Sequence, residues 1–115
     1  MQRFPLERRL VRSADFERVR KEGQVVRGRF LSIGYLCQPE QRLQAGFVTS
    51  RRIGNAVVRN RVRRRLREIF RRHQSEIESP CHLVMIAAPR AAKATYAELE
   101  QEWLRLARRT SILAP

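Results

Sequence analysis

One stretch of the chain constrains the fold more than any other, because its apolar residues recur at the spacing of a single helical face. Between Ala56 and His73 these residues are Val58, Val62, Leu66, Ile69 and Phe70, at positions i, i+4, i+8, i+11 and i+12. Asn55 comes directly before the stretch and can cap it, since an asparagine side chain accepts from free backbone N–H groups of the first turn. The sequence therefore predicts an amphipathic helix over residues 56–73.

The other sides of this predicted helix are densely basic. Between Arg59 and Arg72 the chain has eight arginines and one acid, Glu68. On a wheel of about 100° per residue, the residues opposite the apolar stripe are Asn60, Arg64, Arg67, Glu68 and Arg71. One flank holds Arg61, Arg65 and Arg72, and the other edge, from which long side chains could reach across a sheet, holds Arg59 and Arg63. Like charges this dense, with almost no acid partners, would weaken an unliganded helix, so a face bound to a polyanion is favoured over a solvated one.

The whole chain shares this charge. Its 115 residues include 25 basic and 11 acidic side chains, which leave a formal net charge of +14. Nucleic acid is the expected partner, with an acidic membrane surface or simple solubility as the competing interpretations. All the basic residues except Lys21 and Lys93 are arginine, which suits bidentate phosphate contacts and stacking on bases, although a codon bias would give the same composition.

The turn before the predicted helix extends the basic surface. Arg51 and Arg52 precede the helix, and Gly54 lets the backbone turn tightly before Asn55. Free N–H groups of the first helical turn would then lie close to two guanidinium groups. This arrangement attracts phosphate.

Length and composition fit a single domain over residues 1–115, ordered from about 4 to 110. No window of about 18 apolar residues could span a bilayer, and residues 1–5 lack the apolar core of a secretion signal, so the cytoplasm is the expected compartment. Cys37 and Cys81 belong to no C-x-x-C pair, which argues against a zinc site. Two buried thiols in a reducing compartment are expected instead.

A first, shorter helix is predicted over residues 14–22. Ser13 can act as its N-cap, Phe16 and Val19 fall three apart on one face, and Gly23 ends it.

Strand-length apolar runs occupy residues 30–37 and 43–50, separated by the polar segment 38–42. We expect these two runs to pair as adjacent antiparallel strands, with residues 25–26 as a short edge strand. The unbroken apolar run at 83–88 fits a strand that is buried on both faces and central in the sheet.

A last helix is predicted up to about Arg109. Thr95 and Glu98 have the spacing of a capping box. Its apolar side consists of Tyr96, Leu99, Trp103, Leu106 and Ala107. The tail at 111–115 is expected to be loose.

Residues 50–68 read Ser-Arg-Arg-Ile-Gly-Asn-Ala-Val-Val-Arg-Asn-Arg-Val-Arg-Arg-Arg-Leu-Arg-Glu, with Arg59-Asn60-Arg61 at the centre. This run resembles the signature of the bacterial ribonuclease P protein family. A generic arginine-rich helix would not also carry the preceding Arg-Arg-Ile-Gly-Asn-Ala turn, so the motif is highly specific. A basic N-terminus, a Ser-x-x-Phe-x-x-Val-x-x-x-Gly pattern at 13–23 and a strand after the central helix agree with the family, and the likeness covers about residues 4–109.

The resemblance implies an α+β fold, a single-domain two-layer sandwich of a small sheet and three helices, with a left-handed strand-helix-strand crossover. It also implies two RNA partners: the catalytic RNA subunit of ribonuclease P and the single-stranded 5′ leader of precursor tRNA. The residues implied to bind RNA are Arg51, Arg52, Asn55, Arg59, Asn60, Arg61, Arg63, Arg64 and Arg67. Those implied for a leader-binding cleft are Phe16, Arg20 and Ser50.

One position departs from the family pattern. Many relatives carry a second aromatic residue four positions after the first, where this chain has Arg20. Its guanidinium could pair with a leader phosphate or stack on a base. Phe16 itself is open to two interpretations, base stacking and core packing.

The chain offers no convincing catalytic residue and no metal ligand set. Its acids are scattered, and neither His73 nor His82 has an evident partner. The resemblance implies an endoribonuclease in which the RNA subunit carries the chemistry, with Mg²⁺ held mainly by RNA, so the protein alone is expected to be inactive. The alternative is a ribosome-associated or assembly protein that binds structured RNA without a role in catalysis. A DNA-binding domain is the weaker third interpretation, because arginines surround more of the helix than a groove-reading face requires.

Overall fold

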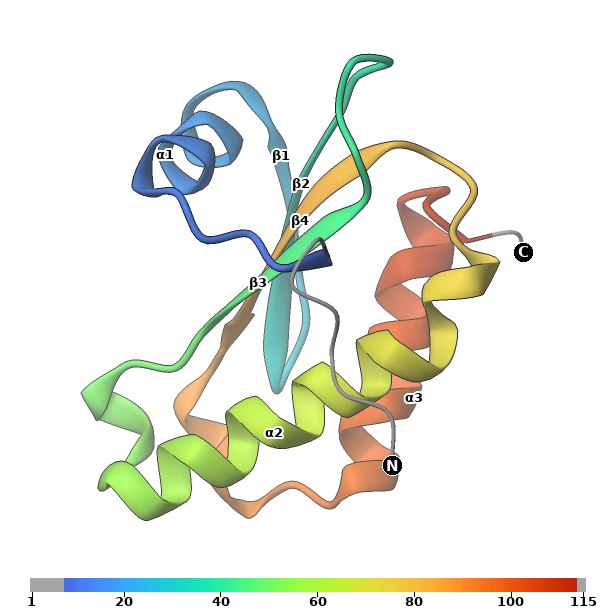
Figure 1. Cartoon of the computed structure of the whole chain (residues 1–115). Coiled ribbons are helices and arrows are strands. Elements are labelled where there is room, and N and C mark those ends of the chain that lie inside the picture. Colours follow the sequence, from blue (N-terminus) through green and yellow to red (C-terminus); the bar gives the residue numbers. More distant parts are fainter. Residues whose placement is uncertain (1–7, 114–115) are drawn as a thin grey trace.

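The computed structural model describes residues 8–113, which form an α+β fold as predicted (Figure 1). The helices are α1 (Ser13–Glu22), α2 (Ala56–His73) and α3 (Tyr96–Arg109). The strands are β1 (Gln24–Arg27), β2 (Leu31–Cys37), β3 (Gln44–Val48) and β4 (Cys81–Ala87). The connecting 3-10 turns are η2 (Arg51–Ile53), η3 (Gln74–Glu76) and η4 (Pro89–Lys93). Residues 4–7 of the range that we expected to be ordered lie outside the described part.

The four strands form one mixed sheet in the order β1-β2-β4-β3. The strand β2 pairs antiparallel with both β1 and β4, whereas β3 runs parallel to β4. The prediction that the runs at 30–37 and 43–50 are adjacent antiparallel strands is therefore wrong, because β4 lies between them. Six of the seven residues of β4 are buried, and the strand pairs with β2 on one side and β3 on the other. The predictions of a central strand there and of an edge strand at 25–26 are confirmed.

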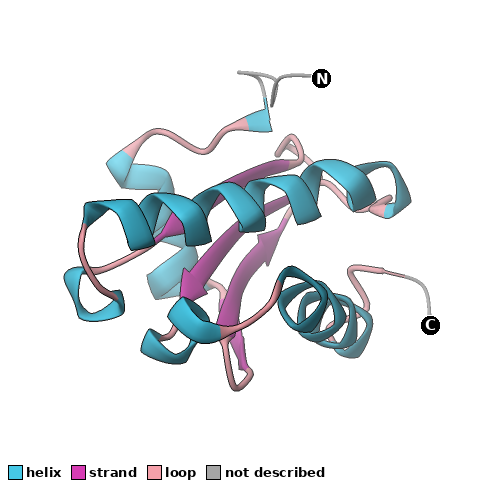
Figure 2. Ribbon diagram, turned by 90° about the horizontal axis from the view of Figure 1, so that it is seen from below, coloured by secondary structure: helices cyan, strands magenta, loops and turns pink. Residues whose placement is uncertain are grey.

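The helices lie on opposite faces of this sheet. The helices α2 and α3 pack together against one face, and α1 lies on the other (Figure 1). Figure 2 shows the long α2 crossing over the strands. The parallel pair β3 and β4 is joined through α2, and this is the crossover for which the family resemblance predicts a left-handed sense.

The two faces of the sheet differ in how well they are covered. The main core lies on the side of α2 and α3 and is centred on fully buried side chains such as Trp103, Phe70 and Leu66. On the α1 side only a small cluster is buried, made of Leu10, Val19 and Val84 with Phe16 and Leu36 packed beside it. The ten-residue α1 therefore leaves part of its face of the sheet open.

The helix boundaries follow local capping signals in two of three cases. The Asn55 side chain accepts from the Val58 N–H at 3.0 Å, and Thr95 and Glu98 form the complete capping box that their spacing predicts. The prediction for α1 is wrong in one detail. Ser13 is the first residue of that helix rather than its cap, and Arg12 takes the cap position without a side-chain hydrogen bond.

The chain returns to the core after α3. Ser111 adopts a left-handed backbone conformation with φ of 66°, and the N–H groups of Ile112 and Leu113 both donate to the Ala107 carbonyl at 3.1 Å. The side chains of Ile112 and Leu113 are buried in the main core. The prediction of a loose tail is therefore wrong for residues 111–113, because two apolar side chains gain more by burial than by remaining in solvent.

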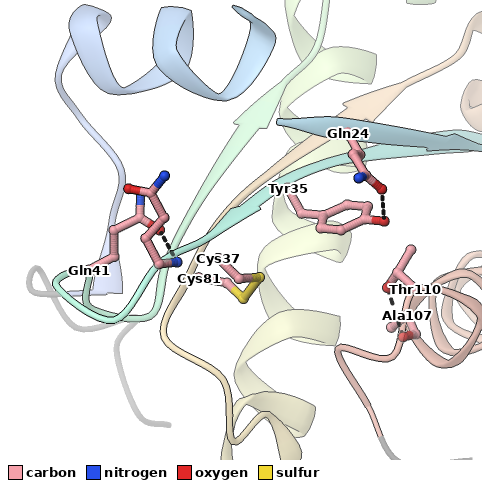
Figure 3. Close-up of a disulfide and its surroundings, with 8 residues drawn as sticks. Gln24, Tyr35, Cys37, Gln41, Cys81, Ala107 and Thr110 are labelled. Carbon is pink, nitrogen blue, oxygen red and sulfur yellow. Dashed lines mark hydrogen bonds between the residues drawn. A yellow bond between two sulfur atoms is a disulfide. The ribbon is translucent and has the colours of Figure 1, made fainter. Parts of the chain in front are cut away.

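The two cysteines form a disulfide between β2 and β4 (Figure 3). Cys37 and Cys81 are direct cross-strand partners, with a Cα–Cα distance of 4.0 Å. The prediction of two buried thiols is wrong, and Cys37 is exposed. The 44-residue separation in sequence gave no hint of the contact, since it depends on β4 lying beside β2.

No helix within residues 8–113 has the length and apolar character needed to cross a membrane.

Candidate nucleic-acid interface

The central helix α2 presents its apolar stripe to the sheet, and this orients its basic sides outward. Of the predicted stripe, Val62, Leu66, Ile69 and Phe70 are buried, and Val58 is half-buried and packs against the same core. Asn60 and Arg64 lie on the opposite, exposed side of the helix. The core contacts of α2 therefore decide which arginines can face a partner.

One flank of α2 is tied to the segment before α3. Arg61 donates to the Ala92 carbonyl at 3.0 Å, and Arg65 donates to the Ala94 carbonyl at 2.8 Å. These bonds hold two long side chains in place and leave further N–H groups on each guanidinium for other acceptors. The helical wheel predicted that these two arginines share a flank, and the structure shows which segment this flank contacts.

The other flank faces β3. Arg63 donates to the Thr49 hydroxyl and, at 3.3 Å, to the Asn60 side-chain oxygen. Arg67 lies on the same flank rather than opposite the stripe, and with Arg63 and Arg9 it lines a hollow of about 320 Å³. Burial lowers the pKa of the Arg67 guanidinium, and the like charges of Arg9 and Arg63 lower it further. This clustering of like charge makes the hollow a favourable place for an anion.

The acids of α2 and its surroundings are already paired. Glu68 accepts from Arg71 at 2.9 Å, and this hydrogen bond lowers the pKa of the Glu68 carboxyl. Arg72 lies 3.5 Å from a carboxylate oxygen of Glu100. Within residues 8–113, no carboxylate forms an ion pair with the first six arginines of the helix: Arg59, Arg61, Arg63, Arg64, Arg65 and Arg67. The N-terminal two-thirds of α2 is therefore the part whose charge is left for a ligand.

The turn before α2 brings more charge to the same end of the helix. In η2 the side chain of Ile53 is buried, whereas Arg51 and Arg52 are exposed. Gly54 has a φ of 154°, and a Cβ there would come within 3.2 Å of the Val58 side chain, so glycine is required at this turn. The helix start is capped by Asn55 and the two arginines precede it in an exposed turn, whereas phosphate binding there stays a prediction.

An apolar groove of about 240 Å³ runs between α1 and the sheet. Phe16, Arg20 and Val19 line it from the helix, and its floor is the row Val25, Gly34 and Val84 with Val48 and Ile86 beside it. Phe16 also lines the arginine hollow on the β3 flank, so its ring forms a wall shared by the two sites.

The ring of Phe16 approaches the sheet closely because residue 46 is a glycine. A Cβ at Gly46 would come within 2.4 Å of the ring. Gly34 and Gly46 flank Val84 in neighbouring strands, so α1 can pack close to the sheet at this row. The ring is half-buried rather than fully enclosed. Part of the ring therefore packs against the sheet, and base stacking on its exposed part stays a prediction.

The remaining predicted cleft residues differ in position. Arg20 lines the groove and is paired with Glu17 at 2.7 Å, a contact that lowers the pKa of the Glu17 carboxyl. Ser50 is exposed just before η2 and is not among the residues that line the groove. The role of each in binding a leader stays a prediction.

Sequence reasoning missed the floor of the groove. Val25, Val48 and Ile86 are 44%, 38% and 39% exposed. Val48 and Ile86 are cross-strand partners in the parallel pair of β3 and β4. Ile86 was predicted to be buried on both faces with the rest of its strand, and this is wrong because α1 is too short to cover it. The alternation of side chains along a strand signals that Val84 and Ile86 share a face.

One of the two histidines has partners that the sequence did not reveal. His73 lies between Glu76 and Glu100, with ring nitrogens 2.6 Å and 2.8 Å from their carboxylate oxygens, and it stacks on Trp103. His82 is buried on the α1 face, where burial lowers its pKa. Within residues 8–113 no three His, Cys, Asp or Glu side chains come together in a group that could hold a metal ion.

Comparison with known proteins places these features in a family context. The family model described as Ribonuclease P matches residues 4–111. A protein of Thermus scotoductus named "Ribonuclease P protein component" is 46% identical over 99 residues, which are 85% of this chain and 57% of that protein. The chain therefore spans little more than half the length of this relative. A protein of the same name from Acidothermus cellulolyticus is 43% identical over 105 residues, 90% of this chain and 88% of that protein.

Solved structures of similar fold carry related names. The ribonuclease P protein of Staphylococcus aureus superposes with a TM-score of 0.85 at 27% identity, covering 92% of this chain and 97% of the other. The ribonuclease P protein of Thermotoga maritima gives a TM-score of 0.79 at 26% identity, covering 88% of this chain and 96% of the other.

Proposed function

Because this chain belongs to the ribonuclease P protein family, we propose that it is the RNA-binding protein subunit of a ribonuclease P. Together with a catalytic RNA it promotes endonucleolytic removal of the 5′ leader from precursor tRNA. The observation that carries this proposal is the placement of the family signature, residues 50–68. Its residues Ile53, Val62 and Leu66 are buried in the core. Two of its arginines, Arg63 and Arg67, line a hollow that shares the Phe16 ring with the apolar groove.

The basic sides of α2 bind the catalytic RNA in this proposal. Arginines without carboxylate partners at the start of the helix neutralise phosphates of the RNA and release its counterions. Arg51 and Arg52 add charge beside the capped first turn, and Asn60 and Arg64 occupy the exposed centre of the face. The planar guanidinium groups favour bidentate contacts to phosphate.

The groove between α1 and the sheet binds the leader. Its lining is mostly apolar, which suits the faces of unpaired bases, and the half-buried ring of Phe16 offers a stacking surface. The arginine hollow next to the same ring can hold a phosphate of the same strand. A mature tRNA lacks the leader, so these contacts would favour precursor over product.

The chemistry is proposed to reside in the RNA, and the chain alone is proposed to be inactive. Hydrolysis of the phosphodiester leaves a 5′ phosphate on the mature tRNA. Magnesium ions, which we place mainly with the RNA, supply Lewis-acid chemistry to this reaction. The residues of this protein position two RNAs whose negative charges would otherwise repel each other, and they do so in the cytoplasm.

A cleavage assay tests the proposal. Precursor tRNA is incubated at low magnesium with a bacterial ribonuclease P RNA, with and without this protein, and with the protein alone. We expect stimulation only in the mixture. Arg64→Ala should weaken this stimulation, whereas Arg105→Ala, which removes the same charge from an exposed position on α3, should not. Tight RNA binding without stimulation would favour the alternative, a ribosome-associated or assembly protein.

A further inference from the structure

A second hollow lies on the flank of α2 that faces α3, away from the leader groove. Its volume is about 510 Å³, within the range of sites that hold small ligands. The lining residues are Val57, Arg61, Arg64, Arg65, Glu68 and Tyr96. Three of these residues, Val57, Arg65 and Tyr96, are not among those that the family resemblance implies for RNA binding.

The hollow has an apolar part that a simple phosphate-binding surface would not need. Val57 is 73% exposed in the first turn of α2, next to a dense series of arginines. Tyr96, at the first turn of α3, is half-buried and lines the same hollow. A single exposed valine is ordinary on a protein surface. Here it shares a concave site with an aromatic ring, and the two together offer an apolar surface to a flat ligand.

The arginines of the hollow are held in place before any ligand binds. Arg61 and Arg65 are fixed by the carbonyls of Ala92 and Ala94, at 3.0 Å and 2.8 Å. Each guanidinium still has further N–H donors. Because these side chains are already ordered, less conformational entropy is lost when they bind an anion.

The charge of the hollow favours an anionic ligand. Its acid, Glu68, is engaged by Arg71 on α2, and this contact holds the pKa of the Glu68 carboxyl below its usual range. Arg61, Arg64 and Arg65 thus face the hollow with no carboxylate partner among residues 8–113. An occupant with an apolar flat part and an attached negative charge matches both halves of the site, and a nucleotide has this chemistry.

We propose that this hollow takes one unpaired nucleotide of the RNA partner, its base against Val57 and Tyr96 and its phosphate on Arg61 and Arg64. The inference rests on the proposed function, because it assumes a structured RNA partner. It adds to that function a site that reads local RNA structure: only an RNA with an extruded nucleotide at this place would fill it. The protein would thereby distinguish its own RNA from a regular duplex.

A matched pair of variants in the first turn of α2 provides the test. Val57→Glu places a negative charge in the hollow, and Ala56→Glu places the same charge on the neighbouring exposed position, which does not line it. Binding is measured with a bacterial ribonuclease P RNA, after circular dichroism shows that both variants are folded. We expect Val57→Glu to bind at least tenfold more weakly than Ala56→Glu. Equal affinities of the two variants would overturn the inference.

The salt dependence of binding separates base contact from phosphate contact. Val57→Ser should weaken binding without changing the slope of log affinity against log salt concentration. Arg64→Gln should reduce that slope by about one unit. An equal change of the slope in both variants would mean that Val57→Ser disturbs the phosphate contacts of the neighbouring arginines, which contradicts a separate base contact at Val57.

Chemical probing at nucleotide resolution identifies the occupant directly. An unpaired nucleotide of the RNA should be protected by the wild-type protein and by Ala56→Glu, and exposed again with Val57→Glu. If Val57→Glu instead changes the oligomeric state of the protein and leaves RNA affinity unaltered, the hollow takes a second copy of the chain and the inference is wrong. If the wild-type protein does not bind the RNA at all, the proposed function fails, and the inference fails with it.

Discussion

The buried carboxylate of Glu102 on α3 accepts a hydrogen bond from the backbone N–H of Leu31, the first residue of β2, at 3.0 Å. The same oxygen accepts from the N–H of Phe30 at 2.8 Å. Both donors would otherwise be without a partner at the start of the strand. A single side chain therefore joins the last helix to the turn between β1 and β2, and Gly28 leaves room for it, since a Cβ there would lie within 2.6 Å of the carboxyl carbon.

Removal of this carboxylate should destabilise the folded protein. Glu102→Ala leaves two partly or fully buried N–H groups unsatisfied, and we expect the free energy of unfolding to fall by about 2–4 kcal/mol. Glu102→Gln retains an acceptor oxygen and should cost less. Urea denaturation followed by tryptophan fluorescence measures both, with Gln101→Ala at the adjacent exposed position as the control. An equal effect of Glu102→Ala and Gln101→Ala would contradict the structural role.

The contact between Phe16 and Gly46 gives a prediction for the groove between α1 and the sheet. In Gly46→Ala the new methyl group must push the ring away from the sheet and into the groove, because it would lie within 2.4 Å of the ring in its present position. We expect a loss of about 1–3 kcal/mol in the free energy of unfolding. The preference for precursor over mature tRNA, measured by competition binding in the holoenzyme, should fall several-fold.

A double variant separates these two effects. Phe16→Leu in the Gly46→Ala background removes the clash, so the free energy of unfolding should recover, whereas the precursor preference should stay low because the stacking ring is gone. Recovery of the preference together with stability would show that the ring does not contact the leader.

The charge of Arg67 should lower the stability of the free protein and strengthen its binding to RNA. Its pKa is lowered by burial and by the like charges of Arg9 and Arg63, so its charge is unfavourable in the free protein. At low salt, Arg67→Gln should leave the free energy of unfolding unchanged or raise it. The same variant should weaken RNA binding and reduce the salt slope by about one unit. Arg108→Gln, at an exposed position of α3, is the control. A loss of stability in Arg67→Gln alone would contradict the role of charge repulsion.

The pH dependence of stability should include a contribution from His82. Burial lowers its pKa in the folded state, and Arg18 lowers it further against an opposing effect of Asp15. As the pH falls through the ordinary histidine value of about 6.5, the unfolded chain takes up a proton that the folded chain does not, so stability is lost. We expect the free energy of unfolding to decrease less steeply between pH 7.5 and 5 in His82→Gln than in the wild type. Parallel profiles would exclude this contribution.

The two longer helices could be predicted because they depend on residues close to one another in the sequence. The periodicity of α2 and the side chains of Asn55 and Thr95 act within a few residues of the backbone they organise, so the bounds of α2 and α3 could be read directly from the sequence. Strand pairing depends on distant residues. The polar segment after Cys37 indicates a hairpin, and only the competition of β4 for the edge of β2 overturns it.

The candidate site also combines features of one helix, which the sequence predicts, with contacts between distant segments, which it does not. The helical wheel placed Arg61 and Arg63 on opposite flanks of α2, because that geometry belongs to the helix itself. What each arginine contacts depends on other segments: Arg61 bonds to η4, and Arg63 bonds to Thr49, the residue after β3. The groove floor was missed for a related reason, since Val48 and Ile86 meet only in the parallel pairing of β3 with β4. The second hollow is formed by α3 as well as α2, so the sequence around Val57 could not predict it.

The strand order has a consequence for the order of events during synthesis. Because β4 lies between β2 and β3, those two strands cannot be joined into one sheet until the ribosome has made the chain up to Ala87. By then the arginine-rich α2 has already been translated. Until β4 is in place, however, the sheet against which α2 packs consists of two separate parts, the β1–β2 pair and the strand β3. Folding of this protein is therefore expected to be completed late, after the basic segment has had time to meet RNA.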